Sequence, residues 1–476
     1  MTEEHKNYFE SKEFKQLLTQ YETSVKSGHL TYIDADDLAD IADYYQMNGR
    51  TTDAGQAISL ALQINPEAVG PLLYKAREAL NSGNFDKARE YAEHLRGSDS
   101  LEHLYLQGEI LICEGKVTEA DDLFRQHFLT ISPDEVNDFV YDVGNLFKDY
   151  ELYDKAFEWA VRSKGDDSDD FKELMAYTLF GLEKYEDSAR LFNELIDHHP
   201  YSKRYWTSLA NVQFMCEEYS DSITSSEFAI AIDPNYPESI LAKANGLYRL
   251  ENYEEALAWF ERYSALIDDD EYGHLHQGSC LINLGRHEEA IKRLEHAKEV
   301  ALDDSPYLPE IYQELAFAYC EHKEPELALY YIDKTSSQNC DHIDLEVIRG
   351  HILLANNRPD EAQRVFKKAI VDSGYSPKTM LRCIVSMYDN GYAESAYHLF
   401  KKFFNYANSA WTDGYSYMAL CCWDLYREKE FLYYLQKAVD KNPQEARTVL
   451  GNLFPKGMEP SEYVSFIKNK LENNRK

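Results

Sequence analysis

The chain has 476 residues, with 49 Lys and Arg against 84 Asp and Glu, a formal net charge of −35 and 44% hydrophobic residues. This apolar share is large enough to build a buried core, so a wholly disordered chain is excluded. No apolar run reaches the roughly 18 residues that span a membrane, and the first residues are acidic and polar. We therefore expect neither membrane insertion nor a secretory signal. The negative charge would repel a phosphate backbone, which argues against a nucleic-acid partner.

The first predicted element is an amphipathic helix over residues 7–26. Its apolar positions recur at three- and four-residue spacing, as on one face of a helix. They are Tyr8, Phe14, Leu17, Leu18 and Tyr21. We expect residues 1–34 to form an N-terminal cap that covers the unit after it.

From residue 35 onward the sequence repeats about every 34 residues, the length of a helix–turn–helix solenoid unit. Two columns carry the repeat, and each is small in eleven of its twelve members. The first column is Ala42, Ala76, Gly108, Gly144, Ala176, Ala210, Ala244, Gly278, Ala316, Gly350, Ile384 and Ala419. The second is Ala54, Ala88, Ala120, Ala156, Ser188, Ser222, Ala256, Ala290, Ala328, Ala362, Ala396 and Phe431.

Each unit holds two helical patterns joined by a short turn, for example residues 205–216 followed by 219–232. A small residue in each helix lets the two axes approach closely, and a large residue such as Phe192 then fills the space between neighbouring units. Proline closes several units, as at His199-Pro200 and Asn442-Pro443, because it cannot continue a helix.

These residues resemble the tetratricopeptide repeats. The small columns, the Tyr before the second column and the closing Pro match that family, most closely over residues 245–260. The resemblance covers residues 35–443, although Ile384 and Phe431 depart from it. It implies an all-α, right-handed α-solenoid of about twelve units, with a concave groove lined by the first helix of each unit.

The last predicted element is a helix opened by Pro460 and running over residues 463–471. Residues 444–476 are expected to form C-terminal capping helices, because terminal units need a polar outer face. No Gly/Ser-rich linker interrupts the chain, and its longest departure from the repeat is four extra residues near 303–309. We therefore predict one continuous solenoid rather than two joined modules.

If the family geometry holds, four positions of each first helix face the groove. Thirteen of these residues are acidic and only four are basic, a higher ratio than in the whole chain. A basic or extended segment of another protein is the matching ligand. The alternative is that these carboxylates are ordinary solvated residues of an acidic protein. The acidic candidates for binding are Asp138, Asp142, Asp170 and Glu173.

Three amides and two tyrosines complete the candidate groove site. Members of this family often place an Asn where Asn145, Asn211 and Asn245 stand, and an amide can both donate to and accept from a peptide backbone. Tyr141 and Tyr177 fall in the same columns and suit binding anchors. Local packing is the alternative role for each of these residues. The family's clamp for a carboxyl terminus is matched only by Lys378 and Arg382, so it is not expected here.

Nothing in the sequence predicts catalysis, a cofactor or a metal. There is no phosphate-binding loop, nucleophile elbow or HExxH motif, and the eight cysteines form no CxxC pair. The favoured function is therefore a non-catalytic, cytoplasmic adaptor that binds a basic segment in an acidic groove. The alternative is a structural subunit that docks through its convex face or its ends. The sequence leaves the oligomeric state open.

Overall fold

The computed structural model describes residues 8–9, 11–27, 32–95, 101–163, 165–267, 270–336, 342–408, 410–455 and 457–473. Across these ranges the secondary structure is helical, with no β-strand. The chain divides into two compact units, residues 1–217 and 218–476. The predicted all-α class is confirmed.

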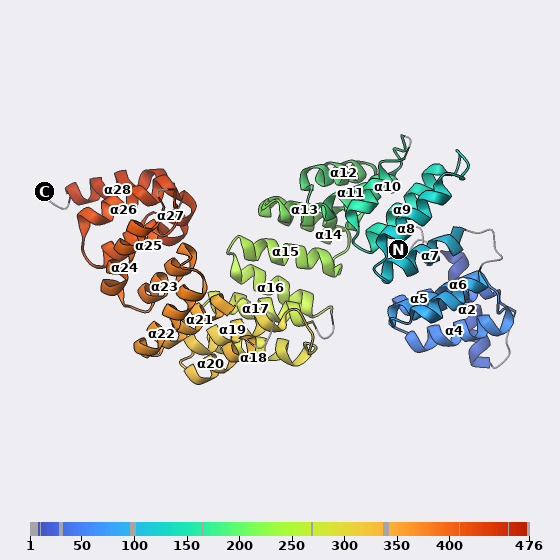
Figure 1. Ribbon diagram of the computed structural model, residues 1–476, viewed down its shortest axis with the longest axis horizontal. Helices are drawn as coiled ribbons and strands as arrows, with labels where there is room; N and C mark the ends of the chain where they lie inside the picture. The colour runs from blue at the N-terminus through green and yellow to red at the C-terminus, as the bar shows by residue number, and fades with distance from the viewer. Residues whose placement is uncertain are drawn as a thin grey trace. The chain divides into compact units, whose positions relative to one another are not determined.

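The described residues of the first unit form one helix, five helix pairs and a final single helix, which follow one another along the ribbon in Figure 1. Their bounds are α2 Lys12–Ser27, α3 Ala35–Met47, α4 Thr51–Ile64, α5 Val69–Asn81, α6 Phe85–His94, α7 Leu101–Cys113, α8 Val117–Phe128, α9 Val136–Asp149, α10 Tyr153–Ala160, α11 Asp169–Gly181, α12 Tyr185–His198 and α13 Lys203–Met215.

The described residues of the second unit form a single helix, six helix pairs, two shorter elements and a last helix, which Figure 1 shows in chain order. Their bounds are α14 Tyr219–Ile232, α15 Pro237–Arg249, α16 Tyr253–Ser264, α17 Glu271–Asn283, α18 His287–Val300, α19 Leu308–Glu321, α20 Pro325–Ser336, α21 His342–Ala355, α22 Pro359–Asp372, α23 Pro377–Asp389, α24 Ala393–Tyr406, α25 Tyr415–Asp424, α26 Glu428–Lys441, α27 Pro443–Leu450, a 3₁₀ turn Gly451–Leu453 and α28 Pro460–Asn473.

The two small columns lie where the helices of a pair touch. A Cβ on Gly108 would stand 2.0 Å from Cζ of Phe124, and one on Gly350 would stand 2.1 Å from Cε1 of Phe366. The large residue therefore sits on the small residue of its own pair. The Phe124 ring also reaches the next pair, where it lies 5.9 Å from the ring of Phe147. The small columns are thus the close-contact points of the fold, as the sequence indicates.

A left-handed residue in the turn ends the first helix of each pair. Its φ is positive in all twelve turns, which are all described, and only five of the twelve residues are glycine. Gly285 has a φ of 71° and Glu251 a φ of 61°, at equivalent places. This conformation costs a non-glycine residue about 1–2 kcal/mol, and the helix pair tolerates that cost because the turn is short.

Both ends differ in detail from the prediction. Within the helix predicted over residues 7–26, Tyr8 and Phe9 are helical, and α2 begins at Lys12 after a bend at Ser11. The Ser11 hydroxyl accepts a hydrogen bond from the Phe14 amide and so caps α2. Residues 1–7 lie outside the described part. At the other end Asn442 and Pro443 start a further helix, α27: the Asn442 side chain accepts from the Glu445 amide at 3.0 Å.

Eleven of the twelve expected helix pairs lie wholly inside one unit, whereas α13 and α14 fall on either side of the unit boundary. Within each unit the successive pairs pack in chain order, which is the stacking of an α-solenoid. The single array over residues 35–443, its caps at 1–34 and 444–476, and its right-handed path remain predictions.

Candidate functional site

Within each unit the first helices of successive pairs share one surface, which we call the first-helix face of that unit. Hydrogen bonds cross directly from one first helix to the next within the first unit. The Tyr105 hydroxyl of α7 donates to Asp142 of α9 at 2.9 Å, and Tyr177 of α11 shares a 2.8 Å bond with Ser208 of α13. The groove columns predicted from sequence are therefore neighbours in space within this unit.

Three carboxylates gather on the first-helix face around Tyr105. Asp138 and Asp142 stand one turn apart on α9, and Glu102 reaches them from α7. Partial burial raises the pKa of Asp142, the negative charges of Asp138 and Glu102 raise it further, and the Tyr105 hydroxyl opposes them. None of the three carboxylates joins an ion pair among the described residues, so their charge is uncompensated.

Glu173 lies on the same face but is already occupied. It forms an ion pair with Arg204, and it accepts a 2.7 Å hydrogen bond from the Tyr205 hydroxyl. Both partners belong to α13, so Glu173 ties α11 to α13. Asp170, one turn earlier on α11, is exposed and has no ion pair among the described residues. The sequence predicts the same binding role for both residues, but in the structure Glu173 is paired and Asp170 is accessible.

The three candidate asparagines differ in the same way. Asn145 donates to the Tyr141 carbonyl at 3.2 Å and accepts from Lys148 at 2.7 Å. Asn211 is exposed on α13. Asn245, in the second unit, accepts a 3.1 Å bond from the Tyr272 hydroxyl. Two of the three amides thus hold local contacts, which leaves Asn211 the most accessible.

The basic residues predicted for the groove are largely neutralised by their neighbours. Arg77 lies 3.4 Å from Glu109, and Arg382 pairs with Asp344. Arg382 also lines a small pocket of about 270 Å³ with Phe317, His351 and six apolar or polar neighbours of α21, α23 and α25. Because these cations are paired, the negative charge of the first-helix face comes from its other carboxylates.

In the second unit two carboxylates, those of Glu310 and Glu314, lie on α19. Burial raises the pKa of Glu314 to about 7, and the charge of Glu310 adds to that effect. Burial also raises the pKa of Tyr248, on α15, to about 12, and both glutamates contribute. Neither glutamate has an ion-pair partner among the described residues. A cation placed between α15 and α19 would relieve their repulsion.

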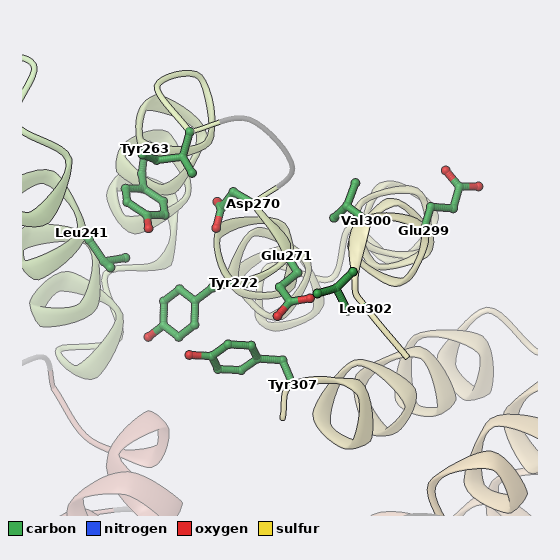
Figure 2. A pocket seen from close by; sticks show the side chains of 10 residues that line it. Leu241, Tyr263, Asp270, Glu271, Tyr272, Glu299, Val300, Leu302 and Tyr307 are labelled. Atoms are coloured by element: carbon green, nitrogen blue, oxygen red, sulfur yellow. The ribbon is translucent and has the colours of Figure 1, made fainter. Parts of the chain in front are cut away.

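Beside these glutamates lies a cavity of about 750 Å³, which we call the tyrosine pocket (Figure 2). Figure 2 shows Tyr263, Tyr272 and Tyr307 around one space, with Asp270 and Glu271 next to them. The rings of Tyr272 and Tyr307 meet edge to face at 5.3 Å. The complete lining is Leu241, Tyr263, Ile267, Asp270, Glu271, Tyr272, Glu299, Val300, Leu302 and Tyr307.

Among the described residues, the lining of the tyrosine pocket carries three carboxylates and no basic side chain. Asp270 and Glu271 also have structural roles: Asp270 caps α17 through the Gly273 amide at 2.9 Å, and Glu271 accepts from Ser305 at 2.7 Å. Their oxygens are thereby fixed in place. Aromatic faces and fixed carboxylates together favour a cationic side chain.

Sequence reasoning missed Tyr263 and Tyr307, because neither falls in a groove column. Tyr307 belongs to the seven-residue connection between α18 and α19, where four extra residues depart from the repeat. The connection between α14 and α15 has only four residues. The insertion was visible in the sequence and was the available signal for this pocket.

Other chemistry finds little support in the described residues. No group of three or more metal-binding side chains is present in them, and none of their helices is long and apolar enough to cross a membrane. Seven cysteines are free, and Cys340 lies outside the described part. Burial raises the pKa of the Cys280 thiol to about 12, so this thiol behaves as a packing group.

Comparison with known proteins matches two segments of the chain to family models. Residues 73–134 match the tetratricopeptide repeat, and residues 213–297 match subunit 3 of the anaphase-promoting complex, or cyclosome. A curated protein, anaphase-promoting complex subunit 3 of Schizosaccharomyces pombe, is 23% identical over 239 residues, which are 49% of this chain. The match spans about a third (35%) of that relative's length.

Several solved structures are also similar. The APC/C heterotetramer Cut9–Hcn1 aligns over 95% of both chains with 13% identity and a TM-score of 0.38. The type IV pilus biogenesis factor PilW aligns over 44% of this chain and 96% of its own, with 18% identity and a TM-score of 0.40. The repeat found in the residues, the helix pairs and the matched family models agree, and the chain is a tetratricopeptide-repeat protein.

Proposed function

We propose that the chain is a non-catalytic scaffold that binds an extended, basic segment of another protein along its first-helix face. The observation that carries this proposal is the pairing on that face. Three of its four basic residues, Arg77, Arg204 and Arg382, are held by carboxylates of the chain itself. Six other carboxylates of the face join no ion pair among the described residues, so an incoming cation would meet them with little competition. They are Glu102, Asp138, Asp142, Asp170, Glu310 and Glu314.

Each unit supplies contacts on its own first-helix face. In the first unit the contacting residues are Glu102, Asp138 and Asp142 around Tyr105, together with Asp170 on α11. In the second unit they are Glu310, Glu314 and the tyrosine pocket. Asn211 would hold the backbone of the segment through its exposed amide. Glu173, Asn145 and Tyr177 would support these contacts indirectly, because their polar atoms already bind neighbouring side chains.

The test uses two labelled synthetic peptides of equal length, one alternating Lys and Ser and the other alternating Glu and Ser. Fluorescence anisotropy would measure their dissociation constants at about 50 and about 300 mM salt. We expect the basic peptide alone to bind, and to weaken by at least tenfold at the higher salt, because exposed charges are screened.

The decisive variant neutralises the first-unit cluster through Glu102→Gln, Asp138→Asn, Asp142→Asn and Asp170→Asn. It leaves Glu173 intact, because that residue ties α11 to α13. The matched control removes the same charge from exposed second-helix positions: Glu90→Gln, Glu119→Gln, Asp122→Asn and Glu186→Gln. Equal loss of affinity in both variants would reduce the binding to general attraction by an acidic protein and refute a specific site.

A second candidate function is that of a subunit docked in a larger assembly. The curated relative, anaphase-promoting complex subunit 3, is by its name such a subunit. The observation in this chain that favours it is a separate apolar cavity on the second helices, described next. The two functions are compatible, because they use different faces of a helix pair.

A further inference from the structure

The second helices of the second unit leave a gap between α22 and α24. A cavity of about 700 Å³ lies there and is lined by residues of α22, α23 and α24 and by Leu354 of α21. The residues of α23 predicted to face the groove, Lys378 and Arg382, are not among its lining residues, so the cavity and the first-helix face use different sides of α23. We call it the α22–α24 cavity. Its volume falls in the range of sites that hold ligands, and its position calls for an explanation, since solenoid repeats normally close against each other.

The side-chain bonds that join other second helices are missing here. Arg293 of α18 pairs with Glu261 of α16 at 3.0 Å, and Lys401 of α24 pairs with Glu430 of α26 at 3.2 Å. Every residue of α22 and α24 is described, and between these two helices there is neither a hydrogen bond nor an ion pair. The buried core divides at the same place: Phe366 belongs to one hydrophobic cluster and Phe403 to the next.

The cavity is apolar inside and partly open at its edge. Phe366, Cys383, Ile384 and Phe403 are almost completely buried and form its floor. Large apolar side chains at the edge face solvent instead: Val371 is 49% exposed, Tyr375 53% and Tyr406 60%. Exposed apolar side chains gathered round an apolar floor mark an interaction surface rather than a filled core.

The charged residues that line the α22–α24 cavity indicate the kind of partner that would bind there. Lys367 on α22 and Lys402 on α24 stand on opposite sides of the cavity, are exposed, and join no ion pair among the described residues. Among the described lining residues Asp360 is the sole carboxylate. In a chain of net charge −35, two unpaired lysines beside an apolar cleft form a locally positive site, complementary to carboxylates.

We propose that the α22–α24 cavity is the docking site for an amphipathic helix of a partner protein whose apolar stripe is flanked by Asp or Glu. The apolar stripe would enter between α22 and α24, as in other helix-in-groove complexes. Carboxylates on its two sides would reach Lys367 and Lys402. This proposal is independent of the basic segment bound by the first-helix face, because neither the residues nor the sign of the charge is shared.

The probes are two labelled helical peptides of about 18 residues with the same Leu and Phe stripe, one flanked by Glu and the other by Gln. We expect the Glu-flanked peptide to bind the full chain about tenfold or more tighter than the Gln-flanked one. Lys367→Glu with Lys402→Glu should remove that preference. The matched control, Lys429→Glu with Lys468→Glu, changes exposed lysines outside the cavity by the same charge and should keep it.

A blocking variant tests the place of binding. Ser395 and Gln363 are exposed residues of the lining, on α24 and α22. Ser395→Trp should weaken both peptides about tenfold or more, and Gln363→Trp replaces it if the first variant does not fold by circular dichroism. Undiminished binding in the folded blocking variant overturns the proposal. Binding of dodecanoate with no binding of either peptide also overturns it, since the cavity would then be a fatty-acid site.

Binding of the basic Lys–Ser peptide should be unchanged in every one of these variants. That measurement separates the two proposals. Loss of the helical peptides alone supports the α22–α24 site and leaves the first-helix face untouched, whereas loss of the basic peptide in these variants would contradict its binding to the first-helix face.

Discussion

Replacing Glu314 by Gln should stabilise the protein at alkaline pH and leave its stability almost unchanged in acid. Glu314 lies partly buried on α19 beside Glu310, and its pKa is raised from 4.5 to about 7. A carboxyl whose pKa is raised by folding contributes stability that is complete below its unfolded pKa of about 4.5. That contribution is lost as the pH rises through about 7, because the folded state must then hold the charge.

The size of the effect follows from the raised pKa. A change from 4.5 to about 7 corresponds to an upper limit of about 3 kcal/mol, at about 1.4 kcal/mol for each pKa unit. Water reaches part of this side chain, so roughly 1–2 kcal/mol is the expected difference. Glu314→Gln should therefore raise the free energy of unfolding by that amount at pH 8, relative to the unmodified protein, and by almost nothing at pH 4.

The assay is equilibrium urea unfolding at both pH values, followed by circular dichroism, with Glu321→Gln as the control. Glu321 is exposed on the same helix, so its replacement changes the charge of α19 without removing a buried carboxylate. A Glu314→Gln effect that is equal at pH 4 and pH 8 would show that the side chain acts through packing rather than through its charge. A loss of stability at pH 8 would contradict the reasoning outright.

Binding of a basic peptide should report the same carboxylate. A cation near Glu314 lowers its pKa, so binding releases a proton and becomes tighter as the pH rises from 5 to 8. We expect that part of the pH dependence to vanish in Glu314→Gln. If it persists, the basic segment does not approach α19, and the second-unit part of the proposed site is wrong.

Three further outcomes follow from the packing. Glu251→Gly should stabilise the second unit by roughly 1 kcal/mol because it relieves a left-handed φ of 61°, whereas Gly285→Ala should cost about as much; urea midpoints measure both. Gly350→Ala should cost about 1–3 kcal/mol because its Cβ would meet the Phe366 ring, and Phe366→Leu in the same chain should recover part of the loss. Cys280 should react with iodoacetamide in the folded protein far more slowly than in urea, measured by mass spectrometry, because burial raises its pKa to about 12.

Much of the fold could be predicted from the sequence because it depends on single residues at fixed spacing. Ala or Gly in one helix and Ala or Ser in the other set the closest approach of a pair, so two columns predict every pair. The prolines at positions 325 and 359 start α20 and α22, as expected for residues that suit a first turn. The left-handed turn residues were not foreseen, because seven of the twelve are not glycine and carry no sequence signal.

The candidate site was harder to predict from the sequence, because it depends on which side chains form ion pairs and hydrogen bonds with one another. Glu173 and Asp170 occupy equivalent kinds of position, yet Arg204 and Tyr205 engage only Glu173. That choice is made by a residue about 30 positions away, on the next first helix. A repeat column identifies a face of a helix; it does not say whether a neighbouring helix already satisfies the side chains on that face.

The two cavities lie where the repeat is least regular, and this link has a physical cause. The tyrosine pocket borders the connection with four extra residues, which carries Tyr307 out of the register that would fill the space. The α22–α24 cavity includes Ile384, which stands where the flanking pairs have Gly350 and Ala419. A regular repeat fills each interface in the same way and therefore leaves the same surface everywhere. Its departures are the places where one unit differs from the next, and a partner can recognise only what differs.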